Sequence, residues 1–182
     1  HGDRLFSVIV ASEAESYYFN FKEYVDLDMN FVLTEGHLKR LGLLFQRSPA
    51  RLWYLMNASF DLHMLEREGL SVSGEIHDLK IAARLLYSDH FNYSLGALAE
   101  REGLEKSEAV KDFIKEHGLS SWEKVPGKKT RKRLQHFDQV PFDIIAPYGE
   151  RDGRITFDLG RRQRAELRAM DAAAQPSVAK VS

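Results

Sequence analysis

The sequence predicts a mixed α/β fold in which helices pack on a small mixed sheet. Short runs of β-branched and aromatic residues occupy the first third of the chain, and amphipathic helical patterns dominate the rest. The 182 residues are enough for one domain with a hydrophobic core. They are 43% hydrophobic and 29% charged, which is typical of globular proteins, so a packed fold is expected.

The predicted strands are short. Residues 4–11 are rich in β-branched side chains, residues 16–21 alternate aromatic and polar side chains, and the turn SEAE lies between them. This pattern predicts an antiparallel hairpin. The segment RLWYLM, residues 51–56, is typical of a buried strand, and its place between two helical patterns favours a parallel strand added to the same sheet.

The remaining segments mostly show the spacing of amphipathic helices. Predicted helices cover residues 34–47 with Thr34 as N-cap, 59–69 closed by Gly69, 76–87 with Asp78 at its start, 93–102 capped by Ser94, and 107–118 between Ser107 and Gly118. The later segments predict a basic loop over 123–133, a helix over 141–170 broken at Pro147, and a weakly structured end over 172–182.

Composition narrows the possible functions. Cysteine is absent, which excludes disulfides, cysteine-ligated zinc and thiol catalysis, and fits an intracellular, cytoplasmic protein. No apolar run approaches the roughly 20 residues of a membrane span, so we expect no membrane partner. The net charge is −1, so nucleic-acid binding needs a local basic patch.

The segment PYGERDGRIT, residues 147–156, is the first candidate site. Tyr148 and Asp152 are one helical turn apart, which places a phenol and a carboxylate on one helix face. Gly149 and Gly153 stand in the same helix, where each costs about 1 kcal/mol relative to alanine. We therefore expect a small, open helix surface beside the two polar side chains. The alternative is a solvated helix face with Tyr148 half-buried.

The segment NASFDLHML, residues 57–65, is the second candidate site. Asn57 follows a strand and Asp61 lies one helical turn later, at the kind of sheet edge where α/β proteins bind ligands. Alternatively, Asn57 caps the helix and Asp61 interacts favourably with the helix dipole. Asp61 and Asp152 together supply carboxylate oxygens, the ligands that Mg²⁺ prefers. Two such metals about 4 Å apart can activate water and cleave a phosphodiester.

A run of cations supplies candidate contacts with phosphates. Its members are Lys124, Lys128, Lys129, Arg131, Lys132 and Arg133. We expect these side chains to contact the backbone of single-stranded DNA, with Trp122 or Phe137 as a stacking partner for a base. The alternative is a solvated charged loop without a ligand.

The ordered set of motifs resembles the 3′–5′ exonuclease domain of family A DNA polymerases, which belongs to the DEDD exonucleases of ribonuclease-H-like fold. MNASFDLHML is similar to the second exonuclease motif, and APYGERDGRITFDL to the third motif of the tyrosine subclass. Between them, IHDLKIAARLL and NYSLGALAERE resemble two helices of the family in order and spacing. VPFDIIAPYG resembles the approach to the third motif, and QPSVAKVS the start of the connection to a polymerase domain.

This resemblance implies roles for the candidate residues. Asp61 and Asp152 would bind two Mg²⁺ ions, with Mn²⁺ as a substitute, and Tyr148 would position the attacking water. Asn57 and Phe60 would flank the terminal nucleotide at the 3′ end of single-stranded DNA. The implied function is proofreading, the removal of misincorporated 3′ nucleotides by hydrolysis, and the implied partner is a polymerase domain of the same chain.

One motif of the family is missing from the sequence. The first motif, Asp-x-Glu on the first strand, should lie just upstream of HGDRLFSVIV, which resembles the second strand. We therefore expect residues 1–171 to form an N-terminally incomplete exonuclease domain, inactive alone, and residues 172–182 to begin a linker. Two alternatives stay open: a degenerate DNA-binding or structural domain of a polymerase, and a ribonuclease D-like enzyme that trims RNA 3′ ends.

Overall fold

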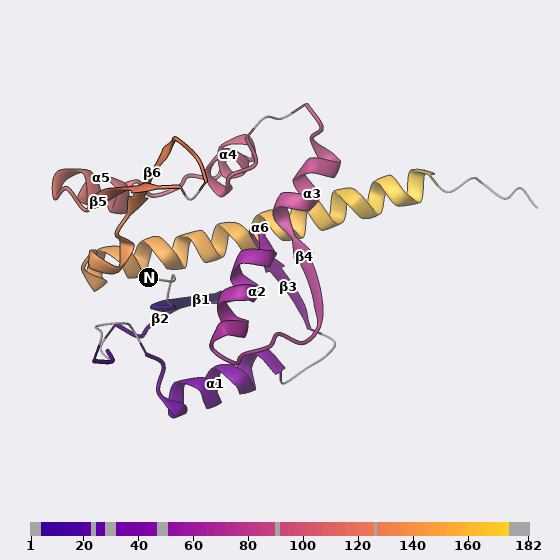
Figure 1. Cartoon of the computed structure of the whole chain (residues 1–182). Helices are drawn as coiled ribbons and strands as arrows, with labels where there is room; N and C mark the ends of the chain where they lie inside the picture. Colours follow the sequence, from indigo (N-terminus) through magenta and orange to yellow (C-terminus); the bar gives the residue numbers. More distant parts are fainter. Residues whose placement is uncertain are drawn as a thin grey trace, which may run out of the picture. The chain divides into compact units, whose positions relative to one another are not determined.

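The computed structural model describes residues 5–22, 25–27, 32–46, 51–89, 92–125 and 127–174, and Figure 1 shows the chain coloured along its sequence. Its class is mixed α/β, as predicted. The chain divides into two compact units. Unit 1 comprises His1–Thr34 and Glu105–Arg154, and unit 2 comprises Glu35–Leu104 and Ile155–Ser182.

Unit 1 begins with the predicted hairpin. Strands β1 (Ser7–Ala11) and β2 (Ser16–Asn20) pair antiparallel, with Ile9 opposite Tyr18, which confirms the prediction from the alternating pattern. Its later elements are α5 (Ala109–Glu116), β5 (Ser120–Lys124), β6 (Arg131–Gln135), the 3-10 helix η1 (Phe137–Gln139) and the first part of α6 (Phe142–Ala174). The buried core of the unit comprises Val110, Ile114, Val140 and Ile145.

The basic segment of unit 1 forms a hairpin rather than the predicted loop. Strands β5 and β6 pair antiparallel, with Trp122 opposite Arg133. The turn between them is closed by the Val125 N–H, which donates to the Thr130 carbonyl at 3.2 Å. The loop prediction was wrong at its two ends, residues 123–124 and 131–133, and right for residues 127–130 between the strands. Most side chains of both strands are exposed, so no apolar alternation marks the strands in the sequence.

Gly149 and Gly153 bring α6 close to the β1–β2 hairpin. A Cβ atom at Gly149 would lie 2.7 Å from Tyr18 Cδ2, and one at Gly153 would lie 2.7 Å from Ile9 Cγ2. Both distances are far inside van der Waals contact, so only glycine permits this packing. The expected open surface beside the candidate site is therefore wrong, because the two glycines face the hairpin.

Unit 2 holds a parallel strand pair, β3 (Leu52–Leu55) and β4 (Glu75–Asp78), which confirms the parallel strand predicted at residues 51–56. Its helices are α1 (Glu35–Gln46), α2 (Ala58–Arg67), α3 (Leu79–Leu86), α4 (Leu95–Arg101) and the second part of α6. The helix predicted over residues 76–87 is wrong at its start, because residues 76–78 pair with β3. Asp78 ends that strand and begins α3, as predicted for the helix start.

The two faces of β3 pack on different helices. Tyr54 packs on α6, where its ring lies T-shaped to Phe157 with 5.7 Å between ring centroids. A Cβ atom at Gly160 would lie 2.2 Å from the Tyr54 ring, so the close approach of strand and helix needs glycine. On the other face, Trp53 packs T-shaped on Phe45 of α1 at 5.6 Å. Helices therefore cover both faces of this parallel pair.

Hydrogen bonds join the described strands in three separate pairs, β1–β2, β3–β4 and β5–β6. The single mixed sheet expected from the sequence is not formed among these strands. The alternating patterns predict that a strand forms, but the identity of its partner depends on contacts between distant segments.

Helix α6 runs without interruption through Pro147, so the predicted break is wrong. Proline removes one backbone hydrogen bond of α6 at this point, and the helix continues on both sides of it. Of the segment 172–182, residues 172–174 are helical and the others lie outside the described residues. Within the described residues, no helix combines the length and the apolar character that crossing a membrane requires.

Candidate functional site

Unit 1 brings Tyr148, Asp152 and Lys106 into one polar cluster. The Lys106 Nζ lies 3.0 Å from Asp152 Oδ2 and 5.3 Å from the centroid of the Tyr148 ring. The predicted pairing of phenol and carboxylate on one helix face is therefore accompanied by an ammonium group. Lys106 was missed by the sequence analysis, because nothing in its local sequence links it to α6.

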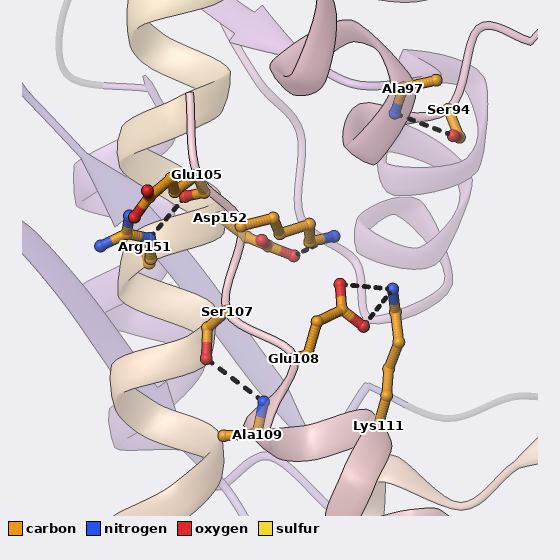
Figure 2. Close-up of polar contacts among 10 residues, drawn as sticks. Ser94, Ala97, Glu105, Ser107, Glu108, Ala109, Lys111, Arg151 and Asp152 are labelled. Atoms are coloured by element: carbon orange, nitrogen blue, oxygen red, sulfur yellow. Dashed lines mark hydrogen bonds and ion pairs between the residues drawn. The ribbon is translucent and has the colours of Figure 1, made fainter. Parts of the chain in front are cut away.

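The segment that carries Lys106 is attached to α6 by its backbone. The Arg151 Nε donates to the Glu105 carbonyl at 2.7 Å, directly beside Lys106 (Figure 2). Farther along, Lys111 on α5 forms an ion pair with Glu108 at 2.8 Å. The position of the Lys106 ammonium therefore depends on the fold of unit 1, and not on a long side chain moving freely in water.

Burial and charge shift the pKa values in this cluster. Burial raises the pKa of Asp152, and the Lys106 ammonium opposes that rise. Burial also raises the pKa of Tyr148, so its phenol stays protonated at neutral pH. Burial lowers the pKa of Lys106, but Asp152 and Tyr148 raise it by more, so the net shift is upward. The cluster therefore combines a lysine–aspartate ion pair with a phenol that ionises less readily than a free tyrosine.

Unit 2 holds the second candidate site at the carboxyl ends of β3 and β4. Asp78 receives hydrogen bonds from two helix starts: the Ala58 N–H donates to Oδ2 at 2.8 Å and the Lys80 N–H to Oδ1 at 2.9 Å. Asn57 adopts a left-handed backbone with φ of 64° and makes no side-chain capping bond. Its Oδ1 accepts from Lys80 Nζ at 3.3 Å instead. Asn57 is thus the N-cap residue of α2 and Asp61 lies in the first turn, as the alternative predicts, but the Asn57 side chain does not cap the helix.

Asp61 lies half-buried next to Asp78. Burial and the neighbouring Asp78 carboxylate raise the pKa of Asp61 to about 6. Phe60, which precedes it on α2, leaves 53% of its surface exposed. The site therefore offers a partly buried carboxylate and an exposed aromatic ring close to the end of β3.

The described residues provide only part of a binding site for a divalent cation. Asp61 and Asp78 repel each other in a desolvated place, and a cation would relieve that repulsion. At Asp152 the Lys106 ammonium already neutralises the carboxylate. Across the described ranges, no group of three or more His, Asp or Glu side chains lies together as a metal-binding set.

The basic hairpin presents its cations to solvent. Lys128 and Lys129 stand in the turn, and Arg131 and Arg133 lie on β6. Trp122, opposite Arg133, is 64% exposed and available for stacking. Phe137, the other predicted stacking partner, packs against the core of unit 1. One aromatic ring and a row of cations therefore share this hairpin.

No protein-family model, no curated protein and no solved structure matches this chain. Its function is therefore inferred from its motifs and from the geometry within each unit. The sequence by itself predicts one site acid in each unit, Asp61 and Asp152. It does not predict the contact of Lys106 with Asp152, and for Asp78 it predicts only a position at the start of a helix.

Proposed function

We propose that the chain is the 3′–5′ exonuclease domain of a DNA polymerase, with a ribonuclease-H-like fold. The observation that carries the proposal is the pairing of Tyr148 with Asp152 on one face of α6. A phenol next to a carboxylate can orient a water molecule at a metal ion, which is the arrangement implied by the tyrosine-subclass motif. The order of hairpin, parallel strand pair and long late helix supports the same family.

The proposal assigns one metal-binding carboxylate to each unit, Asp61 in unit 2 and Asp152 in unit 1. Bound Mg²⁺ or Mn²⁺ would supply an activated water and stabilise the leaving oxygen of the phosphodiester. Tyr148 positions the water through its protonated hydroxyl. Asn57 and Phe60 contact the terminal nucleotide, and the exposed ring of Phe60 supports that role.

The basic hairpin contributes the contact with the DNA strand. Neutralising Lys128, Lys129, Arg131 and Arg133 to glutamine removes four cations, and each phosphate contact contributes about 0.7 to the salt slope for a single strand. We expect the slope of log affinity against log salt to flatten by up to about 2.8. A slope unchanged in this variant contradicts the role of the hairpin.

The test of the enzyme is nucleotide release from 3′-labelled single-stranded DNA with Mg²⁺ or Mn²⁺. The chain is assayed as given and also as the full-length product of its gene. In the full-length product we expect metal-dependent release, reduced at least about 100-fold by Asp152→Asn. Asp143→Asn, an exposed carboxylate in the same helix, is the matched control and leaves the rate unchanged.

Two results overturn the enzyme proposal. One is the absence of metal-dependent release from both folded chains, and the other is release that survives Asp152→Asn. An RNA oligonucleotide of the same sequence runs in parallel. Faster trimming of RNA than of DNA moves the assignment to a ribonuclease D-like enzyme.

A non-catalytic DNA-binding module of a polymerase is the second candidate. The observation that favours it is the Lys106–Asp152 ion pair, because this carboxylate already has a counter-ion within the chain. The two candidates differ in one measurement: the module binds single-stranded DNA in the presence of Mg²⁺ and releases no nucleotide from it.

A further inference from the structure

A cleft of about 310 Å³ lies between β3 and α6 in unit 2, away from every residue that the sequence analysis selected. Its lining comprises Leu52, Tyr54, Arg161, Arg164, Ala165 and Arg168. We call it the arginine cleft. One wall comes from strand β3 and the other from helix α6, so regular structure within a single unit determines its shape.

The three arginines form one row along α6. Residues 161, 164 and 168 follow the i, i+3, i+7 spacing, which places them on one helix face. This face meets β3 because Gly160 lets α6 lie directly against the Tyr54 ring. With 1.5 Å of rise per residue, the row is about 10 Å long.

Arg164 is held in position before any ligand arrives. Its Nη1 donates to Glu75 Oε1 at 2.6 Å and its Nη2 to Glu75 Oε2 at 3.0 Å, a bidentate pair between α6 and β4. Arg161 places its guanidinium 5.7 Å from the centroid of the Phe157 ring. Two of the three guanidinium groups are therefore oriented by neighbours in the fold, which lowers the entropy lost on binding an anion.

The cleft is positively charged. Three arginines line it; the Glu75 carboxylate offsets the charge of Arg164, and Arg161 and Arg168 are exposed to solvent. Arg162, the neighbour of Arg161 in sequence, does not line the cleft; it pairs with the Glu102 carboxylate at 3.1 Å. Guanidinium groups match phosphate oxygens in geometry and charge better than an ammonium does.

We propose that the arginine cleft binds consecutive phosphates of a single-stranded nucleic acid. The row is about 10 Å long, which is too long for one phosphate to contact all of it, so its length favours a strand with several phosphates. This inference is independent of the exonuclease proposal, because it uses no residue of either candidate site or of the hairpin.

The experiment measures binding of a fluorescent oligothymidine of about 12 nucleotides by anisotropy, at several salt concentrations. The variant is Arg161→Gln with Arg168→Gln, which leaves the Arg164–Glu75 pair in place. We expect weaker binding and a salt slope flatter by about 1.4, from two lost contacts at 0.7 each. Arg162→Gln is the matched control on the same helix and leaves the slope unchanged.

Three further arms make the result decisive. The same pair of substitutions in a hairpin-neutralised chain separates the cleft from the hairpin. Arg161→Lys with Arg168→Lys keeps the charge and retains the slope, which covers the case in which the glutamine variant does not fold. Competition with inorganic phosphate and with a nucleoside monophosphate identifies the ligand.

The proposal is supported if an unlabelled strand displaces the fluorescent oligothymidine at least 10-fold better than the monophosphate does. Equal displacement by the monophosphate assigns the cleft to a single nucleotide and overturns the proposal of a strand. A slope that stays the same in the folded glutamine variant overturns the phosphate site altogether. None of these results depends on nucleotide release, so they remain informative whether or not the chain is an exonuclease.

Discussion

Replacing Asp61 by asparagine is expected to stabilise the protein at neutral pH. The Asp61 carboxylate lies next to Asp78 in a desolvated place, so its ionised form raises the free energy of the folded state. Asparagine has nearly the same shape and carries no charge. A substitution at a predicted catalytic residue therefore increases stability, as expected where a site places a charge in an unfavourable environment.

The magnitude follows from the pKa. A rise from 3.8 to about 6 corresponds to about 3 kcal/mol at pH 7 as an upper limit, since one unit is 1.36 kcal/mol. Allowing for partial exposure of Asp61, we expect a gain of about 1–3 kcal/mol. The Asp61 carboxyl group keeps its proton to a higher pH in the folded state than in the unfolded state. The free energy of unfolding of the wild type therefore falls as pH rises from about 4 to about 6, and the variant lacks this fall.

The assay is urea unfolding at pH 4 and at pH 7, followed by circular dichroism. The variant and the wild type should agree at pH 4 and separate at pH 7. Glu66→Gln, an exposed acid on the same helix, is the control and should change stability by less than about 0.5 kcal/mol at both values. Asp78→Asn should instead destabilise the protein by about 1–2 kcal/mol, because Asp78 accepts hydrogen bonds from two helix starts.

Two results would refute this reasoning. Equal stability of Asp61→Asn and wild type at pH 7 would mean that the Asp61 carboxylate is solvated, and that Asp78 does not repel it. Lower stability of the variant at pH 7 would mean that Asp61 makes a favourable contact as an anion, which would require a cation beside it.

Other substitutions test the packing and the ion pair through the free energy of unfolding. Gly160→Ala should lower it by more than about 2 kcal/mol, since the new methyl group would overlap the tyrosine ring on β3; a neutral effect would contradict the close contact. Lys106→Met should lower it by about 1–3 kcal/mol by leaving the carboxylate of Asp152 without its ammonium, and adding Asp152→Asn should restore most of the loss. If the effects of the Lys106 and Asp152 substitutions on the free energy of unfolding simply add, the pairing is contradicted. Pro147→Ala should raise it by about 1–3 kcal/mol, because alanine restores a backbone hydrogen bond in α6; a decrease would show that the ring makes a contact that α6 needs.

Much of the fold could be predicted because its signals are local. The alternation along residues 16–21 predicted the hairpin, and Ser94 predicted a helix start where its Oγ accepts from the Ala97 N–H at 3.3 Å. The spacing of Tyr148 and Asp152 placed them on one helix face, since helix geometry alone determines which residues share a face. These features depend on backbone preferences within a few residues.

The errors occurred where short-range rules compete with contacts between distant segments. Pro147 signals a break, but α6 continues through it. The charged hairpin at residues 123–133 lacks an apolar face, so its strands form without the pattern that usually reveals them. Gly149 and Gly153 were predicted to open a surface, but they allow a helix and a hairpin to pack closely.

The sequence by itself determined the class of fold, most helix starts and the residue types of both candidate sites, because period and capping are properties of neighbouring residues. Only the tertiary structure decided the electrostatic environment of those sites. It placed Lys106 against Asp152, Asp78 beside Asp61, and three arginines of α6 in a cleft with β3. Charges interact through space and are strengthened by burial, so the environment of each group depends on which distant segments the fold brings within a few ångströms.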